Sequence, residues 1–221
     1  NVSEIFGELI TLIEEDKRLG KDEALEIMLP YSKEKFGVPP NLYIIGTMNT
    51  ADRSVEALDT ALRRRFSFTE MPPLYDLSGL DYEFAGTKGS EILKKINKRI
   101  EKLLDRDHLI GHSYFLLSEG EKDHPEARLK DSFYSNIIPL LQEYFFGDYE
   151  KIGMVLGSGF VYTETDKVNF ASGYGDNEDF IENEIYQIID YRHGQPGREY
   201  IQNEMTFKKA VRLLMGDGSD A

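Results

Sequence analysis

The chain has 221 residues, of which 40 are acidic and 26 basic, giving a formal net charge of −14, and it contains no cysteine. The lack of cysteine excludes disulfides, thiol catalysis and cysteine-ligated zinc, and no run of about 18 apolar residues suggests a membrane span. The first residues lack the pattern of a secretion signal, so we expect a cytoplasmic protein. The acidic balance argues against direct nucleic-acid binding by this chain.

The first part of the sequence predicts helices around a parallel sheet. Apolar side chains spaced by three and four positions predict a helix over residues 2–17. Glycines and prolines over residues 18–41 indicate a loop or a hairpin. The continuous apolar run at residues 42–47 is typical of a strand that is buried on both faces of a parallel sheet.

A turn over residues 48–54 and a helix that ends in three arginines follow this strand. Val55, Leu58 and Leu62 lie on one side of the predicted helix, and the arginines stand at its C-terminal end, where the helix dipole favours cations. Residues 66–68 alternate like a short strand, which a pair of prolines ends.

From about residue 75 the pattern becomes helical. Helical stripes cover residues 90–104 and 132–146, and Pro139 is expected to kink or restart the second helix. After residue 147 the chain is acidic and less periodic. We expect a hairpin there, formed by residues 160–162 and 168–170, and a last short helix at residues 207–215.

Asn49 stands at the carboxyl end of the predicted buried strand, where open α/β sheets bind their ligands. A side-chain amide there can orient a water for attack on a terminal phosphate. An asparagine in this position can equally cap the following helix, and position alone favours that structural role.

Arg63, Arg64 and Arg65 form a basic cluster in an acidic protein. Taken alone, the cluster is best explained by solvated side chains that complement the helix dipole. The functional interpretation is an arginine finger, which reaches the nucleotide of a neighbouring subunit and stabilises charge on the transferred phosphoryl group. That interpretation requires an oligomer.

These residues carry a family resemblance. The string Tyr43-Ile44-Ile45-Gly46-Thr47-Met48-Asn49-Thr50-Ala51-Asp52-Arg53-Ser54, followed by Asp59-Thr60-Ala61-Leu62-Arg63-Arg64-Arg65-Phe66-Ser67-Phe68, resembles the AAA+ module of the McrB family. Members are GTP-hydrolysing motor subunits of 5-methylcytosine-specific, modification-dependent restriction systems. Residues 1–18, 110–115 and 139–146 agree in order and spacing, so the resemblance covers about residues 1–150.

The resemblance implies a fold and its division into domains. Residues 1–74 would be the C-terminal part of an AAA+ α/β core, with a partial parallel sheet and helices. Residues 75–150 would be a small helical lid, and residues 151–221 an irregular acidic α+β tail that the resemblance does not cover. A ring oligomer, expected to be a hexamer, follows from the same resemblance.

Roles for individual residues follow from the same comparison. Asn49 matches the sensor-1 asparagine, and Arg64 matches the trans-acting finger, with Arg65 and then Arg63 as the next candidates. The segment from Asn49 to Asp52 has been likened to a guanine-reading element of small GTPases. We expect Asp52 to be an interface or structural residue instead.

Two further positions complete the set that the resemblance implies. Arg53 is a candidate for nucleotide binding or for the interface. His112 would lie in the lid over the nucleotide, where a structural role is expected for it.

The sequence also departs from the family, because it contains no Gly-x-x-x-x-Gly-Lys-Ser/Thr phosphate loop. Residues 9–15 mimic an apolar strand that ends in acids, but their helical spacing makes them a false match to the magnesium-holding motif. We therefore expect the C-terminal part of a longer protein, with GTP or ATP and Mg²⁺ bound mostly by upstream residues. The chain alone is expected to be inactive.

The expected partners are further copies of the chain and an endonuclease subunit of McrC type. DNA would be contacted mainly by a separate N-terminal domain, and no membrane is involved. The residues leave GTP and ATP both open as the nucleotide.

Three alternatives remain open. The first is a MoxR-like ATPase that remodels proteins, and the second is an AAA+ scaffold without catalysis. The third is a metal hydrolase, suggested by His108 and His112 at a spacing of four with Asp105 and Asp107 nearby. No His-Glu-x-x-His motif occurs, so we favour surface or lid histidines and expect no metal site.

Overall fold

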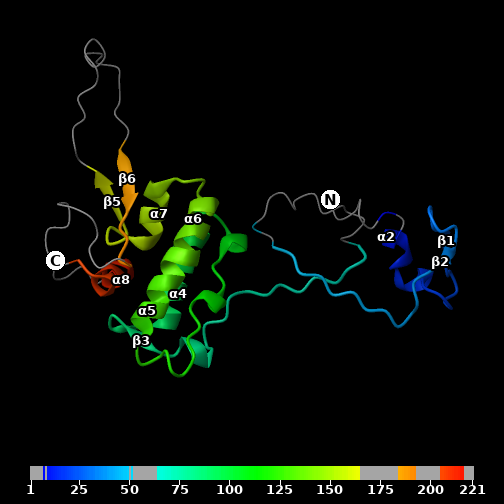
Figure 1. Cartoon of the computed structure of the whole chain (residues 1–221), viewed down its shortest axis with the longest axis horizontal. Helices are drawn as coiled ribbons and strands as arrows, with labels where there is room; N and C mark the ends of the chain where they lie inside the picture. Colours follow the sequence, from blue (N-terminus) through cyan, green and yellow to red (C-terminus); the bar gives the residue numbers. More distant parts are fainter. Residues whose placement is uncertain are drawn as a thin grey trace, which may run out of the picture. The chain divides into compact units, whose positions relative to one another are not determined.

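The computed structural model describes residues 7, 9–49, 51, 64–164, 184–192 and 205–216. The chain divides into two compact units, residues 1–71 and residues 72–221 (Figure 1). The separate status predicted for residues 151–221 stays a prediction, although the described part of that segment belongs to the second unit.

Unit 1 contains short helical and extended elements. They are α2 (Leu9–Leu12), the 3-10 helix η1 (Glu15–Lys17), β1 (Ile27–Met28) and β2 (Lys35–Phe36). The helix predicted at residues 2–17 is thus described as one α-turn followed by a 3-10 turn, and most of its first half lies outside the described residues. Arg18 holds this region together, since its guanidinium donates to the carbonyls of Ile13 and Leu42.

Of the loop or hairpin expected over residues 18–41, the structure contains the hairpin. Strands β1 and β2 pair antiparallel, with Ile27 opposite Phe36 and Met28 opposite Lys35. Lys33 closes the turn with a φ of 59°, in the left-handed region that turns require and that most side chains avoid.

The strands predicted at residues 42–47 and 66–68 are not formed. Tyr43 and Ile45 of the first segment are 85% and 94% exposed, where burial on both faces was expected. A strand needs a neighbouring backbone to satisfy its N–H and C=O groups, and no other described strand pairs with either segment. The predicted helix after residue 54 lies outside the described residues.

The described part of unit 2 is built from helices and four short strands, which form two antiparallel pairs. Its helices are η3 (Ser78–Leu80), α4 (Gly89–Leu103), η4 (Arg106–His108), η5 (His112–Tyr114), α5 (Pro125–Ser132), η6 (Phe133–Ile137), α6 (Ile138–Tyr144), α7 (Tyr149–Leu156) and α8 (Phe207–Met215). Its strands are β3 (Glu83–Phe84), β4 (Thr87–Lys88), β5 (Val161–Glu164) and β6 (Ile185–Ile188). No helix among the described residues is both long and apolar enough to cross a bilayer.

The two long helical stripes of the sequence are confirmed, and proline acts as predicted. Helix α4 buries Ile92, Leu93, Ile96 and Ile100 on one face. Around Pro139 the second stripe changes from the π-helical turn η6 to α6, which carries the proline in its first turn. The helical backbone continues through this point, and the π-helical turn lies just before the proline, which has no N–H to donate to the preceding turn.

The described part of the C-terminal segment contains one strand pair. Strand β5 pairs antiparallel with β6, with Val161 opposite Ile188 and Glu164 opposite Ile185. The expected partner, residues 168–170, lies outside the described residues. The final helix is confirmed as α8 at residues 207–215.

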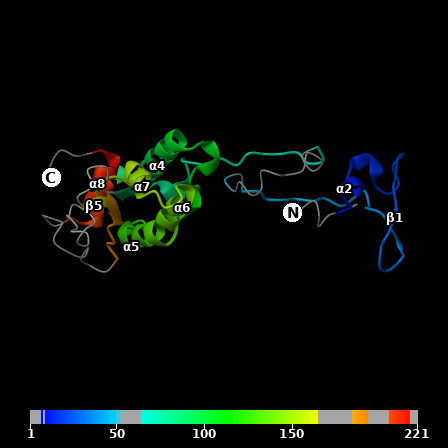
Figure 2. The ribbon, with the colours of Figure 1, turned by 90° about the horizontal axis from the view of Figure 1, so that it is seen from above.

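Helix α8 packs against α4 and α5 and closes the core of unit 2 (Figures 1 and 2). The rings of Phe133, Phe160 and Phe207 contact one another at centroid distances of 5.1 to 5.9 Å. Gly159 allows the close approach, because a Cβ there would lie 2.6 Å from the Cα of Ala210.

Candidate functional site

Asn49 lies at the end of the extended segment of unit 1 and is exposed. Its Oδ1 accepts a hydrogen bond from the backbone N–H of Ala51 at 3.2 Å. This local contact is the Asx turn that asparagine commonly forms. It uses the acceptor side of the amide and leaves the NH₂ group as a donor for a ligand or water.

The neighbouring arginines have different surroundings. Arg64 is exposed and makes no ion pair with a described residue. Arg65 is turned into unit 1, where its guanidinium forms an ion pair with Glu14 and its side chain is 18% exposed. Asp52, Arg53 and Arg63 lie outside the described residues.

His112 begins the 3-10 helix η5 in unit 2 and is half-buried. Its Nδ1 accepts a hydrogen bond from the backbone N–H of Leu74 at 3.1 Å. The proton of the neutral ring therefore resides on Nε2. Asn49, Arg64 and Arg65 belong to the first unit and His112 to the second.

Asn97 holds the segment before His112 and was missed by the sequence reasoning. It is 2% exposed, and its amide pairs with the backbone of Ile110, donating to the carbonyl at 2.9 Å and accepting from the N–H at 2.7 Å. Its amide also donates to the hydroxyl of Tyr75 at 3.1 Å. The sequence pattern could have revealed it, because Asn97 follows Leu93 by four residues. That spacing places Asn97 on the apolar face of α4.

The rest of the Gly111–Phe115 segment is fixed by two hydroxyl groups. Ser132 at the end of α5 donates to the carbonyl of Tyr114 at 2.5 Å, and Tyr82 donates to that of Phe115 at 3.2 Å. Burial raises the pKa of Tyr82 well above its usual value, so the phenol stays protonated and able to donate.

His108 serves the fold in a similar way. Its Nδ1 is 2.6 Å from Oδ1 of Asp105, and its ring meets the edge of Tyr144 at 4.8 Å. The hydrogen bond with His108 lowers the pKa of the Asp105 carboxyl. Since His112 also uses its Nδ1 within the fold, the two histidines do not share a metal through these atoms, and the described residues contain no group of three metal-ligating side chains.

Arg99 joins α4 to the C-terminal ends of two other helices. Its guanidinium donates to the carbonyls of Val155 in α7 at 2.6 Å and of Leu214 in α8 at 2.7 Å. Carbonyls in the last turn of a helix have no partner within that helix, and a cation there also complements the helix dipole. Partial burial lowers the pKa of Arg99.

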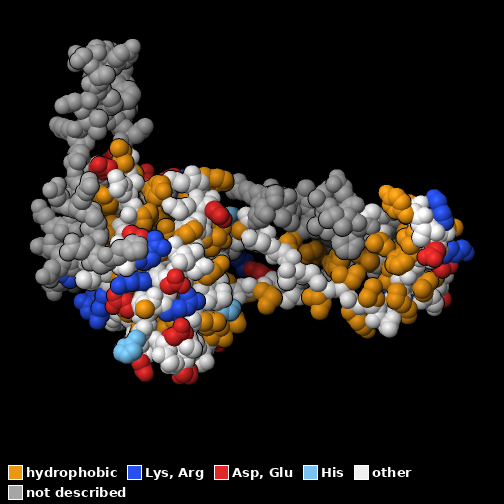
Figure 3. All heavy atoms as spheres, viewed as in Figure 1, with side chains coloured by type: hydrophobic (Ala, Val, Ile, Leu, Met, Phe, Trp, Pro, Cys, Tyr) orange, Lys and Arg blue, Asp and Glu red, His pale blue; other side chains and the backbone are white. Residues whose placement is uncertain are grey.

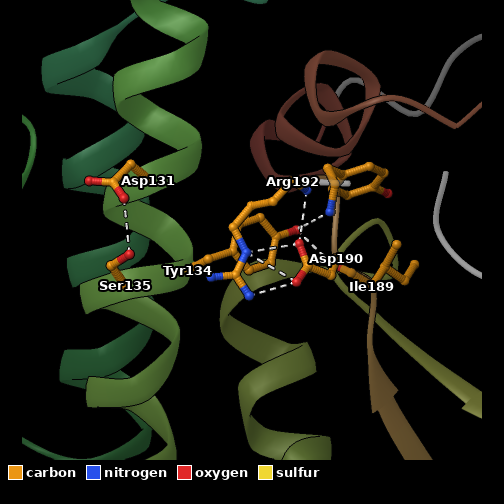
Figure 4. A network of polar contacts seen from close by, with 7 residues as sticks. Asp131, Tyr134, Ser135, Ile189, Asp190 and Arg192 are labelled. Carbon is orange, nitrogen blue, oxygen red and sulfur yellow. Dashed lines mark hydrogen bonds and ion pairs between the residues drawn. The ribbon is translucent and has the colours of Figure 1, made fainter. Parts of the chain in front are cut away.

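A second polar network binds the end of β6 to the π-helical turn (Figure 4). The hydroxyl of Tyr134 donates to the carbonyl of Ile189 at 2.5 Å and accepts from the N–H of Tyr191 at 3.2 Å. Arg192 lies over the Tyr134 ring at 5.0 Å and is held there by Asp190. π-Helical turns often occur at functional positions. Here the turn positions Tyr134, which binds residues 189–191 of the C-terminal segment.

Comparison with known proteins identifies both parts of the chain. Residues 1–66 match the family model of the AAA domain (dynein-related subfamily), and residues 88–153 match that of the McrB alpha-helical lid domain. The two matches follow each other in the order of an AAA core and its lid. The expected fold class is thereby confirmed, and with it the succession of core and lid.

Two curated relatives are components of restriction enzymes. The chain is 39% identical over 163 residues to the type IV methyl-directed restriction enzyme EcoKMcrB subunit of Escherichia coli K12, covering 67% of this chain and 35% of that protein. It is 29% identical over 139 residues to the type II restriction enzyme BsuMI component YdiS of Bacillus subtilis 168, covering 55% of this chain and 40% of that protein. The chain thus spans about a third to two fifths of the relatives it matches.

Proposed function

Since the chain belongs to the McrB family of AAA proteins, we propose that it is part of the nucleoside triphosphatase motor of a modification-dependent DNA restriction system. The observation that carries this proposal is the succession of an AAA match and a McrB-lid match in one chain. The restriction-enzyme relatives support the assignment to a defence system.

Asn49 is proposed to position the attacking water. An amide that donates to water or to a phosphate oxygen acts by fixed geometry and needs no proton transfer. The exposure of Asn49 supports this role, and its amide NH₂ group donates to no other residue that the structure describes. The Asx turn fixes the side chain before a ligand arrives.

Arg64 is proposed as the finger that acts on the nucleotide of the adjacent subunit. A finger must extend from its own subunit, and Arg64 is exposed, whereas the ion pair with Glu14 holds Arg65 within unit 1. The structure therefore favours Arg64 over Arg65. We assign Arg65 to the stability of unit 1.

The bound nucleotide is proposed to be GTP with Mg²⁺, with ATP as the other candidate. Mg²⁺ neutralises charge on the phosphates when it is bound. The sequence has no phosphate loop, and its described residues offer no cluster of three carboxylates or histidines for a metal. Most contacts to the nucleotide would therefore come from the part of the AAA module that this chain does not span. The chain supplies Asn49 and Arg64.

The remaining partners follow from the family. We propose a ring of identical subunits, expected to be a hexamer, acting with an endonuclease subunit of McrC type. DNA would be recognised by a separate N-terminal domain, and Arg53 and Asp52 are proposed for the nucleotide or subunit interface.

The deciding experiment measures hydrolysis of GTP and of ATP by the complete parent protein, with and without the candidate endonuclease. GTP turnover that the endonuclease stimulates supports the restriction motor. ATP turnover that ignores the endonuclease supports a remodelling ATPase, and no turnover with either nucleotide supports a scaffold.

Two variants assign the residues in the same assay. Asn49→Ala is expected to lower turnover by on the order of 10²-fold or more with nucleotide binding retained. Arg64→Ala is expected to abolish turnover in a pure ring and to be partly rescued by mixing with Asn49→Ala subunits, which still carry the finger. Without such rescue, Arg64 acts within its own subunit or not at all.

A further inference from the structure

We infer that His112 and Asn97 form a latch that fixes the connection between the AAA unit and the lid, which makes His112 a positioning residue for the motor. The inference rests on the proposed function, because the latch is assigned to the coupling of nucleotide turnover to the lid. The latch is defined by four residues: Leu74 and Tyr75 of the connection, and His112 and Asn97 of the lid.

The first hydrogen bond of the latch uses the first backbone N–H group that follows the two prolines of the connection. Pro72 and Pro73 begin unit 2, and neither has a backbone N–H. Two successive prolines also restrict the backbone to a stiff, extended form. Leu74 carries the next N–H group, and Nδ1 of His112 accepts it at 3.1 Å.

The next residue is held from α4. The hydroxyl of Tyr75 accepts from the amide of Asn97 at 3.1 Å, and the ammonium group of Lys94 lies 5.7 Å from the centre of the Tyr75 ring. Two successive residues of the connection are thus bound by side chains from two different elements of the lid. A stiff proline pair that ends in a fixed anchor transmits displacement better than a freely jointed chain.

Asn97 also fixes the backbone of the segment that carries His112. Asn97 binds both backbone groups of Ile110, two residues before His112. The Gly111–Phe115 segment and the connection therefore share one anchor on α4. A shift of the lid segment, such as a bound nucleotide would cause, must move Leu74 and Tyr75 with it.

The chemistry of the latch predicts which substitutions it tolerates. Asparagine in place of His112 sets an acceptor oxygen close to the position of Nδ1, whereas leucine keeps a similar bulk without an acceptor. Tyr75→Phe removes the hydroxyl group and keeps the ring. His124 is an exposed histidine at the start of α5 without a side-chain capping bond, so His124→Leu is the matched control.

The test measures hydrogen exchange of the Leu74 amide by NMR in the whole 221-residue chain. We expect His112→Leu to speed this exchange about five- to tenfold, as loss of one hydrogen bond would, and His112→Asn to restore most of the protection. His124→Leu should leave it unchanged. Exchange at Leu74 that is equal in wild type and His112→Leu overturns the latch. Tyr75→Phe, with Asn97 intact, checks the second anchor should His112→Leu fail to fold.

The positioning role is tested in the complete parent by separating kcat from nucleotide affinity. We expect His112→Leu to lower kcat severalfold with little change in nucleotide Kd, and His112→Asn to rescue kcat. Faster Leu74 exchange with unchanged kcat would leave a latch without a positioning role and would overturn that part of the inference. A wild-type parent without turnover would defeat the proposed function, while the exchange data would still decide the latch.

Discussion

Unit 2 buries most of its described large apolar side chains in one continuous core, whereas unit 1 exposes many of them along its hairpin and along the extended residues 42–49. Phe115, Phe133, Phe160 and Phe207 are almost fully buried in the second unit. Tyr31, Tyr43, Ile45 and Met71 are more than 80% exposed in the first. Figure 3 shows apolar side chains gathered over the visible face of the first unit.

The contrast follows from how helices and strands satisfy their backbones. A helix makes its hydrogen bonds within itself and needs neighbours only for its apolar face. A strand needs neighbouring strands for its backbone hydrogen bonds and further elements to cover its apolar faces. The helices of the lid therefore pack among themselves, whereas the apolar segment at residues 42–47 is largely exposed and pairs with no described strand.

Truncation should produce the largest effect. The family lid match ends at residue 153, but Phe160, Phe207, Ala210 and Leu214 complete the core of unit 2. We expect a 72–221 fragment to fold cooperatively and a 72–153 fragment to lack a thermal unfolding transition. Circular dichroism melts of the two fragments decide this, and a cooperative melt of the shorter one would show that α8 is dispensable.

Removal of one core ring should lower the stability less. Phe207→Ala removes a ring that contacts the rings of Phe84, Phe133, Phe160 and Tyr191, and we expect a loss of about 3–5 kcal/mol in the free energy of unfolding of unit 2. Lys208→Ala, at the exposed neighbouring position, should change it by less than about 0.5 kcal/mol. Urea unfolding of the whole chain measures both, and equal losses would contradict the assigned core.

Ile45→Ala should distinguish this chain from its parent. The side chain is 94% exposed here, so we expect a change in unfolding free energy within about 0.5 kcal/mol in this chain. In the complete parent, where further strands would cover residue 45, the loss should reach about 2–4 kcal/mol. An equally small effect in the parent would mean that residues 42–47 are not a central strand there.

Alkaline pH should produce the smallest effect, and we expect it in unit 2. Burial raises the pKa values of Tyr82, Tyr134 and Tyr191 above the value of about 10 that is usual for tyrosine. A raised pKa in the fold contributes stability that is fully present below pH 10 and is lost as the pH rises further.

The melting temperature of unit 2 should therefore fall between pH 9.5 and 11. Its dependence on pH should be shallower in Tyr82→Phe, which has one buried phenol fewer. If the melting temperatures of the variant and the wild type fall with pH to the same extent, Tyr82 does not contribute to the loss of stability at alkaline pH.

Much of the lid could be predicted from the spacing of apolar residues. The helices at residues 90–104 and 207–215 were predicted almost to their ends, because their stripes face a core and their neighbours are helical. The partner of β5 was not predictable, because residues 161–164 pair with a segment more than 20 positions away. Asn97 was missed because one polar residue on an apolar stripe shows its partners only after folding.

The sequence by itself determined the helical stripes, the proline restart at Pro139, the absence of a phosphate loop and the strings of residues that mark an AAA core and its lid. These are properties of neighbouring residues, and local backbone physics sets them. Tertiary structure alone decided that Arg65 pairs with Glu14 while Arg64 stays exposed, that Arg99 caps two helices, and that His112 binds Leu74. These contacts join residues far apart in the sequence, and their formation depends on where the packed elements place each donor and acceptor.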